Sequence, residues 1–251
     1  MGKIIAVVNQ KGGVGKTTTA VNLTAALHDL GLKILLVDFD PQANATSGLG
    51  VDKRHTKNSV YDVVINGVAP ELAIVKTPYG DVMPSHADLA GAGVELLSVG
   101  SPNYQLASAL KQVKDQYDVI FIDCPPSLEL LTLNGLCAAD SILVPVQCEY
   151  FALEGLSDLM STLRAVKRKL NPKLEIFGVA LTLFDGRTNF STQVAQEVRR
   201  HFPGKVFATV IPRNIRLAEA PSHGLPVTVY DRSSRGSVAY RAMAEEIAKK
   251  I

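Results

Sequence analysis

Short runs of apolar, often β-branched residues alternate along this chain with longer segments in which apolar residues recur at helical spacing. The runs are nearly continuous in apolar residues, as in parallel strands that are buried on both faces. They predict strands over Ile4–Val8, Ile34–Asp38, Val119–Asp123, Ile142–Val146, Ile176–Thr182 and Val206–Ile211. The spacing predicts helices over Lys16–Leu30, Tyr104–Gln116, Leu128–Ala139, Leu153–Leu170, Ser191–Phe202 and Ser234–Lys250.

This alternation predicts an α/β fold, a mostly parallel twisted sheet with helices on both faces. Residues 48–100 are less regular, and we expect short helices and an edge hairpin there. No linker rich in Pro, Gly or Ser interrupts the pattern, so we expect a single domain over residues 1–251. Ligands of such sheets bind at the carboxyl ends of the strands, which directs attention to the residues that follow each strand.

A glycine-rich loop, KGGVGKTT at residues 11–18, joins the first predicted strand to the first predicted helix. The glycines allow successive backbone N–H groups to turn toward phosphate oxygens, and the helix N-terminus adds partial positive charge. The candidate phosphate-binding residues are Lys11, Gly12, Gly13, Val14, Gly15, Lys16, Thr17 and Thr18.

Three of these side chains have distinct expected roles. We expect Lys16 to contact the β- and γ-phosphates, the Thr17 hydroxyl to bind Mg²⁺, and Thr18 to lie near the α-phosphate. Gln10 stands where the usual G-x-x-x-x-G-K-[ST] pattern has its first glycine, and Lys11 follows it. The loop therefore predicts a site for ATP with Mg²⁺, of a variant form.

Carboxylates follow two further strands. Asp38 and Asp40 come at the end of the strand over residues 34–38, and Asp123 ends the strand over residues 119–123. Phosphoryl transfer needs Mg²⁺, a lysine and a group that orients the attacking water. We expect Asp123 to hold Mg²⁺, Asp38 to support the metal shell through water, and Asp40 to orient the water. With Lys16, Asp40 forms the candidate catalytic set that this chemistry predicts.

Composition fits an ordinary soluble protein, with 47% apolar and 20% charged residues. No apolar run reaches the length of a membrane span, and the N-terminal segment lacks the pattern of a signal peptide, so cytoplasmic residence is expected. The three cysteines form no C-x-x-C pair, which leaves a disulfide framework, a zinc site and an iron–sulfur site unsupported.

The charge is unevenly distributed. Residues 164–251 contain 16 Lys and Arg against 7 Asp and Glu, whereas the rest of the chain is acidic. Such asymmetry indicates either a polyanionic partner or helices with solvated basic faces, and charge alone does not separate the two.

The loop form K-G-G-x-G-K-[ST], with Lys11 ahead of the glycines, resembles the deviant phosphate loop of the ParA/MinD superfamily of P-loop ATPases. The resemblance is closest to the ParA/Soj branch, the chromosome- and plasmid-partitioning ATPases, and covers essentially the whole chain. The stretches that carry it are KGGVGKTT, LLVDFDPQANATSGLG, VIFIDCPPS, LVPVQCEYFALEGL and VIPRNIRLAEAPSHGLPV.

The resemblance implies a slow ATP hydrolase whose ATP-bound homodimer binds double-stranded DNA without sequence preference, and hence association with the nucleoid. A ParB-type partner would stimulate hydrolysis and release the protein. The implied roles place Lys11, Gly12 and Glu149 at the dimer interface, where Lys11 would reach the partner's nucleotide and join the catalytic set. They also place Pro212 and Asn214 beside the adenine, and Arg187 and Arg216 on DNA. Arg213 is left open between a phosphate-side and a structural role.

Three other functions share parts of this pattern. A MinD-like membrane-bound ATPase needs a basic amphipathic C-terminal helix, whereas the helix over 234–250 has mixed charge and no bulky aromatic near its end. An electron-transfer ATPase related to the nitrogenase iron protein needs cluster-ligating cysteines. A nucleotide-binding module without hydrolysis would have no need of Asp40 and Asp123. No membrane partner is expected.

Overall fold

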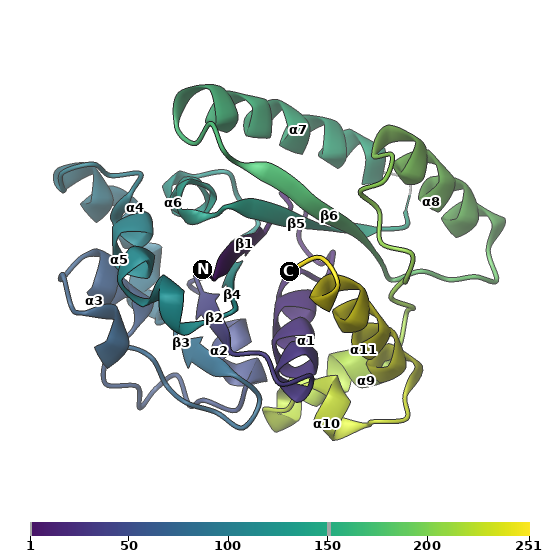
Figure 1. The fold of residues 1–251 in the computed structure, drawn as a ribbon, viewed down its shortest axis with the longest axis horizontal. Coiled ribbons are helices and arrows are strands. Elements are labelled where there is room, and N and C mark those ends of the chain that lie inside the picture. The colour runs from purple at the N-terminus through teal and green to yellow at the C-terminus, as the bar shows by residue number, and fades with distance from the viewer. Residues whose placement is uncertain (1, 150–151) are drawn as a thin grey trace.

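The computed structural model describes residues 2–149 and 152–251, which form one parallel six-stranded sheet in the order β3-β2-β4-β1-β5-β6 (Figure 1). The strands are β1 (Lys3–Val7), β2 (Ile34–Asp38), β3 (Asp81–Met83), β4 (Val119–Asp123), β5 (Ser141–Gln147) and β6 (Glu175–Thr182). The longer helices are α1 (Lys16–Asp29), α5 (Gln105–Val113), α6 (Leu130–Ala138), α7 (Ala152–Lys169), α8 (Asn189–His201) and α11 (Arg235–Ala248). The short ones are α2 (Asn44–Gly48), α3 (Val60–Val64), α4 (Ala92–Glu95), α9 (Ile215–Glu219) and α10 (Val227–Tyr230), with 3-10 turns over Pro70–Leu72, Ala87–Ala90, Leu96–Ser98, Lys114–Gln116 and Ala220–His223.

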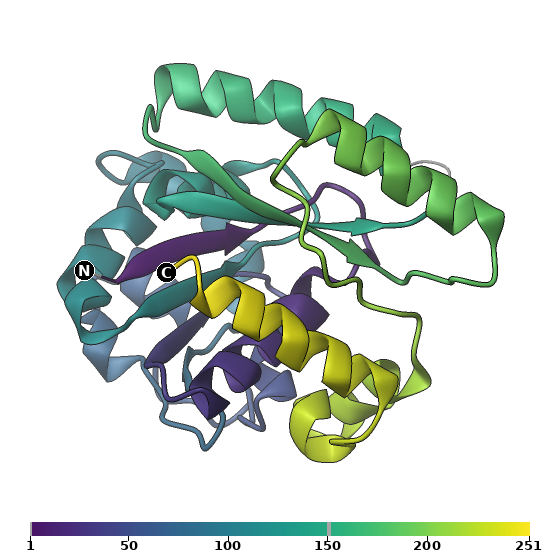
Figure 2. The same ribbon diagram turned by 45° about the vertical axis from the view of Figure 1, so that its right-hand side comes forward.

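Helices cover both faces of the sheet, as Figure 2 shows from a second direction. Along β1, Ile4 and Ala6 pack into the core shared with α3 to α8, and Ile5 and Val7 pack into the core shared with α1 and α11. Because successive side chains of a strand point to opposite faces, burial on both sides requires a continuous apolar run. The fold class predicted from those runs is confirmed.

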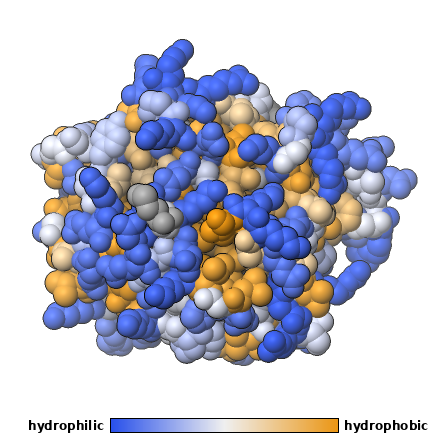
Figure 3. Space-filling view, viewed as in Figure 1, coloured by the Kyte–Doolittle hydropathy of each residue, from blue (hydrophilic) through white to orange (hydrophobic). Residues whose placement is uncertain are grey.

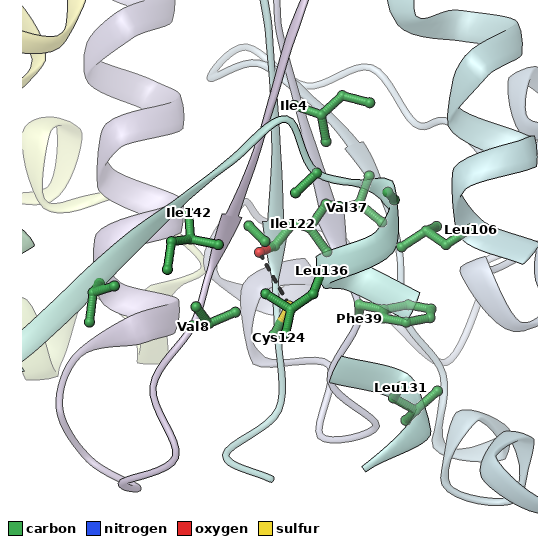
Figure 4. Close-up of a cluster of buried hydrophobic side chains, with 14 of the residues drawn as sticks. Ile4, Val8, Val37, Phe39, Leu106, Ile122, Cys124, Leu131, Leu136 and Ile142 are labelled. Atoms are coloured by element: carbon green, nitrogen blue, oxygen red, sulfur yellow. Dashed lines mark hydrogen bonds between the residues drawn. The ribbon is translucent and has the colours of Figure 1, made fainter. Parts of the chain in front are cut away.

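The first of these cores includes Cys124, which directly follows β4 (Figure 4). Its thiol donates a weak hydrogen bond to the Ile122 carbonyl at 3.8 Å, and burial raises its pKa far above the ordinary value. A Cβ on Gly135 of α6 would lie 2.7 Å from the Cys124 sulfur, so the helix needs glycine to approach this closely. Cys124 is therefore a packing residue in this structure.

Five of the six predicted strands are confirmed, with ends that shift by one residue. The prediction of a strand over Val206–Ile211 is wrong, since Val206 forms only an isolated bridge with Val179. The backbone N–H groups of Ala208 and Thr209 donate instead to the Glu246 carboxylate, at 2.9 and 2.7 Å. A side chain of α11 thus replaces the sheet ladder at these two residues, whereas the N–H groups of Phe207 and Ile211 still donate to the Val179 and Leu181 carbonyls of β6.

The irregular stretch over residues 48–100 contains the expected short helices and the expected edge hairpin. Val75 and Val82 exchange backbone hydrogen bonds of 2.8 and 2.9 Å. Strand β3 of this hairpin, which sequence patterning missed, pairs in parallel with β2 and is too short at three residues to show a period.

The sheet brings the carboxyl ends of β1, β2 and β4 together. The register aligns Val7 with Asp123 and Asp38 with Asp123, so both acids lie beside the start of the loop that leaves β1. Among the described residues, none of the helices combines the length and the apolar character that crossing a membrane requires.

Candidate functional site

The glycine-rich loop occupies the connection between β1 and α1. Gly13 and Gly15 have φ angles of 74° and 87°, a left-handed conformation that glycine adopts without strain. Gly15 is the N-cap of α1, where no side chain caps the helix and no acidic residue stands in its first turn. The free N–H groups of this 14-residue helix are thus available to an anion.

Two polar side chains fix the loop from neighbouring strands. The Asn9 side chain donates to the Pro145 carbonyl of β5 at 2.7 Å and accepts from the Lys11 N–H at 3.0 Å. At the other end of the loop, the Thr182 hydroxyl of β6 donates to the Val14 carbonyl at 2.8 Å. The loop conformation is therefore determined by the sheet before any ligand binds.

Lys16 is a buried cation at the start of α1, with 6% of its surface exposed. Its ammonium donates to the Lys11 carbonyl at 3.1 Å. Burial lowers the pKa of Lys16, and the nearby Asp123 and Asp40 partly offset that effect. The loop thus holds a charge that burial makes costly and that an anionic ligand would stabilise.

Asp123 is fully buried, and neither carboxylate oxygen has a hydrogen-bond partner of ordinary geometry among the described residues. Burial raises its pKa well above the ordinary value, with the adjacent Asp38 raising it further, and the Thr17 hydroxyl and Lys16 acting in the opposite direction. A carboxylate and a hydroxyl are hard oxygen donors of the kind that Mg²⁺ prefers. These unsatisfied oxygens fit a hydrated Mg²⁺ beside the phosphate loop.

Asp38 differs from its neighbour Asp123 because its carboxylate is satisfied. The backbone N–H and the hydroxyl of Thr46 both donate to Asp38 Oδ2 at 2.7 Å, which ties α2 to the end of β2. Burial raises the pKa of Asp38 to about 6. Its predicted support of a metal shell stays a prediction, and its observed contacts are with Thr46.

Asp40 lies two residues further on and is partly exposed. Its carboxylate accepts from the Gln42 N–H at 3.0 Å, which closes a tight turn around Pro41. Asp40 acts electrostatically on both Lys16 and Asp123, so the structure brings together all the predicted members of the phosphate and magnesium site. Its role toward water stays a prediction.

Sequence reasoning missed three residues that shape this site: Asn9, Thr46 and Thr182. Asn9 and Thr46 lie within motifs that the sequence singles out, so small polar residues beside a phosphate loop or a strand-end acid are a usable signal. Thr182 is the last residue of a strand 168 positions from its partner Val14, and nothing local marks it.

The predicted adenine residues lie beyond β6. Pro212 forms an isolated bridge with Phe184 and lines a groove of about 860 Å³, whereas Thr17 and Thr18 line a separate hollow of about 410 Å³. Asn214 is the N-cap of α9, and its side-chain oxygen accepts from the Arg216 N–H at 3.0 Å. Their contact with a base stays a prediction.

The predicted interface residues surround the loop. The ammonium of Lys11 has no partner among the described residues. A Cβ added to Gly12 would meet no atom of this chain within 4 Å. Glu149 pairs with Arg213 at 3.1 Å, and both side chains are about half exposed, which gives Arg213 a structural partner.

The two predicted DNA-binding arginines are exposed and paired with acids. Arg187, in the turn after β6, contacts both oxygens of Asp185 at 2.9 and 2.7 Å. Arg216 contacts Glu219 at 2.7 Å and Asp231 at 3.2 Å. We expected Arg216, like Arg187, in a loop after a predicted strand, but it lies within α9, because Asn214 caps a helix there.

Comparison with known proteins agrees with this site. A family model described as an AAA domain matches residues 2–176. The chain is 54% identical to the sporulation initiation inhibitor protein Soj of Bacillus subtilis, over 99% of both chains, and 48% identical to the chromosome partitioning protein ParA of Myxococcus xanthus, over 100% of this chain and 89% of that one. A solved structure of cobyrinic acid a,c-diamide synthase from Mycobacterium smegmatis with bound ADP and magnesium superposes with a TM-score of 0.86 at 39% identity, covering 99% of this chain and 95% of that one. With its phosphate loop, its strand-end acids and these relatives, the chain belongs to the ParA/Soj family of chromosome-partitioning ATPases.

Proposed function

We propose that this protein is an ATP-driven partitioning switch, which dimerises and binds DNA when it holds ATP and Mg²⁺ and is released when it hydrolyses ATP. The observation that carries the proposal is the buried, unsatisfied carboxylate of Asp123 beside Lys16. Among the described residues, Asp123 has no hydrogen-bond partner of ordinary geometry and Lys16 donates only to a carbonyl, and Mg²⁺ with a polyphosphate supplies a further partner to each. The M. smegmatis relative was solved with ADP and magnesium.

The chain's own residues define the chemistry. When bound, Mg²⁺ neutralises charge on the phosphates. The Lys16 ammonium exchanges the Lys11 carbonyl for phosphate oxygens, and the N–H groups of residues 12–18 surround those oxygens. Asp40 orients the attacking water. The lack of a strong base beside Asp40 among the described residues supports slow intrinsic hydrolysis.

Dimerisation joins two such sites. Lys11 lies in the loop with its ammonium unpartnered among the described residues, and Gly12 beside it is exposed with open space around it. A second chain approaching this face brings Lys11 to the partner's nucleotide, and Glu149 lies at the same interface. The pairing of Glu149 with Arg213 is weak enough, as an exposed ion pair, to exchange on assembly.

DNA binding uses Arg187 and Arg216, which each dimer presents twice. Their chemistry suits phosphates and requires no base readout, so binding is independent of sequence and places the protein on the nucleoid. With about four arginines engaged, log K falls against log salt with a slope of about −3 to −4. A ParB-type partner stimulates hydrolysis and returns the protein to the monomer.

The test measures molecular mass by light scattering and DNA mobility, each with ATP, ADP and no nucleotide. A dimer and a DNA complex that form only with ATP support the proposal, and DNA binding that ignores the nucleotide contradicts it. Arg187→Glu and Arg216→Glu should weaken DNA binding while ATP binding is kept. Arg200→Glu is the matched control, since Arg200 also pairs with an acid three residues away, Glu197.

A further inference from the structure

A groove with an apolar floor runs between α7, the start of β6 and the end of α8. Two adjoining hollows of about 340 and 280 Å³ share Met160 and Arg164. We call this surface the α7–β6 groove; its floor is formed by Leu156, Met160, Leu163, Leu174, Ile176 and Phe202. In Figure 3, which has the view of Figure 1, apolar surface shows below α7 and is bordered by hydrophilic side chains.

The rim of the α7–β6 groove is basic. Arg164, Lys167 and Lys205 line it and are exposed, and their side chains form no ion pair or hydrogen bond with any described residue. Among the residues that the structure describes, Glu175 is the one acidic residue that lines either hollow. These cations belong to the basic C-terminal third of the chain, yet they differ from Arg187 and Arg216, which are already paired with acids.

The groove lies apart from the proposed DNA contacts. Arg216 lies on α9, which covers one face of the sheet together with α1 and α11, whereas α7 and α8 cover the other face together with α6 (Figures 1 and 2). Arg187 follows the carboxyl end of β6, whereas the groove lies at the start of that strand. Contacts with phosphates gain no free energy from an apolar floor, so the binding of duplex DNA would not account for this apolar surface. An occupant that matches both features is apolar along one side and acidic along its flanks.

We propose that the α7–β6 groove docks an acidic amphipathic helix of a partner protein. From Leu156 to Lys167 the groove follows α7 for about 16 Å, at 1.5 Å per residue, which is three turns of a docked helix. Apolar side chains at positions i, i+3 or i+4, and i+7 of that helix fill the floor. Its Asp and Glu residues pair with Arg164, Lys167 and Lys205. This surface acts beside the ATP switch and does not depend on it.

The experiment selects binding peptides from random sequences, so that their chemistry is not chosen in advance. A displayed library of random 16-residue peptides is panned on the full chain and counter-selected on the Arg164→Glu/Lys167→Glu double variant. We expect a consensus with Leu, Ile or Phe at helical spacing and flanking Asp or Glu. A labelled consensus peptide should bind the wild type in fluorescence anisotropy and lose about tenfold or more in affinity on the double variant, because both cations reverse sign.

The matched control is Arg168→Glu/Lys169→Glu, which makes the same change of charge on the same helix at residues that do not line the groove. It should lower peptide affinity clearly less than the Arg164→Glu/Lys167→Glu variant does, because its charges act on the peptide only at a distance and through solvent. Met160→Gln should weaken binding several-fold, since Met160 links the two hollows. Should the double variant melt at a lower temperature than the wild type, Arg164→Gln/Lys167→Gln replaces it.

Three results overturn the proposal. They are a library that yields no enriched peptide, a consensus without acidic residues, and a peptide that binds the double variant as tightly as the wild type. Hydrogen exchange measured with a 20-base-pair duplex or with phosphatidylglycerol vesicles tests whether another polyanion binds the groove. Protection of the groove amides by either one, and not by the peptide, assigns the surface to that partner instead.

Discussion

The phosphate-loop region and the arginine region differ in how their charges are satisfied. Beside the loop, and among the described residues, buried Asp123 has no hydrogen-bond partner of ordinary geometry, and buried Lys16 donates only to a carbonyl. At the arginine region, Arg187 and Arg216 are exposed and already paired with Asp185 and Glu219. A ligand at the first region supplies missing partners, whereas a ligand at the second exchanges existing ones. Substitutions should therefore have large effects at the first region and small effects at the second.

The largest effect is expected for Lys16→Ala, which should abolish ATP binding. Several charge-assisted hydrogen bonds to phosphate are lost, and at about 3 kcal/mol or more this lowers affinity at least about 100-fold. Isothermal titration calorimetry with ATP and Mg²⁺ measures it. Lys33→Ala, which removes an exposed lysine outside the loop, is the control. Unchanged affinity in the Lys16 variant would show that KGGVGKTT is not the phosphate site.

Asp123→Asn should raise stability in the absence of Mg²⁺ while it removes the Mg²⁺ dependence of ATP binding. Without Mg²⁺ the variant should be more stable than the wild type, by about 1 to 3 kcal/mol, because burial of the Asp123 carboxylate raises its pKa well above the ordinary value, and the nearby Lys16 and Thr17 do not offset that cost. Its ATP affinity should no longer depend on Mg²⁺. Urea unfolding in EDTA and calorimetry with and without Mg²⁺ measure the two effects.

Asp38→Asn is the matched control, since Asp38 is aligned with Asp123 and is equally buried. Thr46 donates two hydrogen bonds to it, so this variant should be less stable than the wild type. If Asp123→Asn destabilised the protein as much as Asp38→Asn does, the contrast between a satisfied and an unsatisfied carboxylate would be lost.

The two regions also differ in how far the sequence predicts them. The phosphate loop follows the end of β1, and Asp38 and Asp123 are the last residues of β2 and β4. Parallel strands bring those ends together, so local sequence patterns were sufficient to predict that these residues lie close to one another. The segment over residues 206–211 is apolar enough for a strand, but the N–H groups of Ala208 and Thr209 donate to Glu246, 38 and 37 positions away. Likewise, the pairing of Arg216 with Asp231 depends on how α9 and α10 fold back, which no local pattern encodes.

Glu246→Gln tests the backbone that leads to Pro212 and Arg216. Burial alone would raise the pKa of Glu246, but hydrogen bonds from Thr209 and Ala208 outweigh it and hold the pKa below its ordinary value of 4.5. The stabilisation is therefore present above pH 4.5 and is lost as the pH falls below it. At pH 7 the variant should be less stable by about 1 to 2 kcal/mol.

Chemical denaturation at a series of pH values measures this difference. The difference in free energy of unfolding between wild type and variant should narrow as the pH falls below 4.5. Glu245→Gln is the control, because Glu245 is the exposed neighbour on the same helix. A gap that stayed constant down to pH 3 would mean that the charge of Glu246 contributes nothing to holding the 206–211 segment.

The smallest effect is expected for Asp185→Asn, which should strengthen DNA binding. The substitution frees Arg187 from a carboxylate that contacts two of its nitrogens at 2.9 and 2.7 Å. Because an exposed ion pair contributes little, the gain should be only about two- to fivefold at low salt and should shrink as salt is added. Fluorescence anisotropy with a labelled duplex and ATP measures it, with Glu197→Gln, which frees Arg200, as the control.

Weaker binding by the Asp185 variant would mean that Asp185 positions Arg187 for phosphate and does not compete with it. The ion pair with Asp185 would then hold Arg187 in position for phosphate before DNA binds, just as the fold holds Lys16 in position before a nucleotide binds.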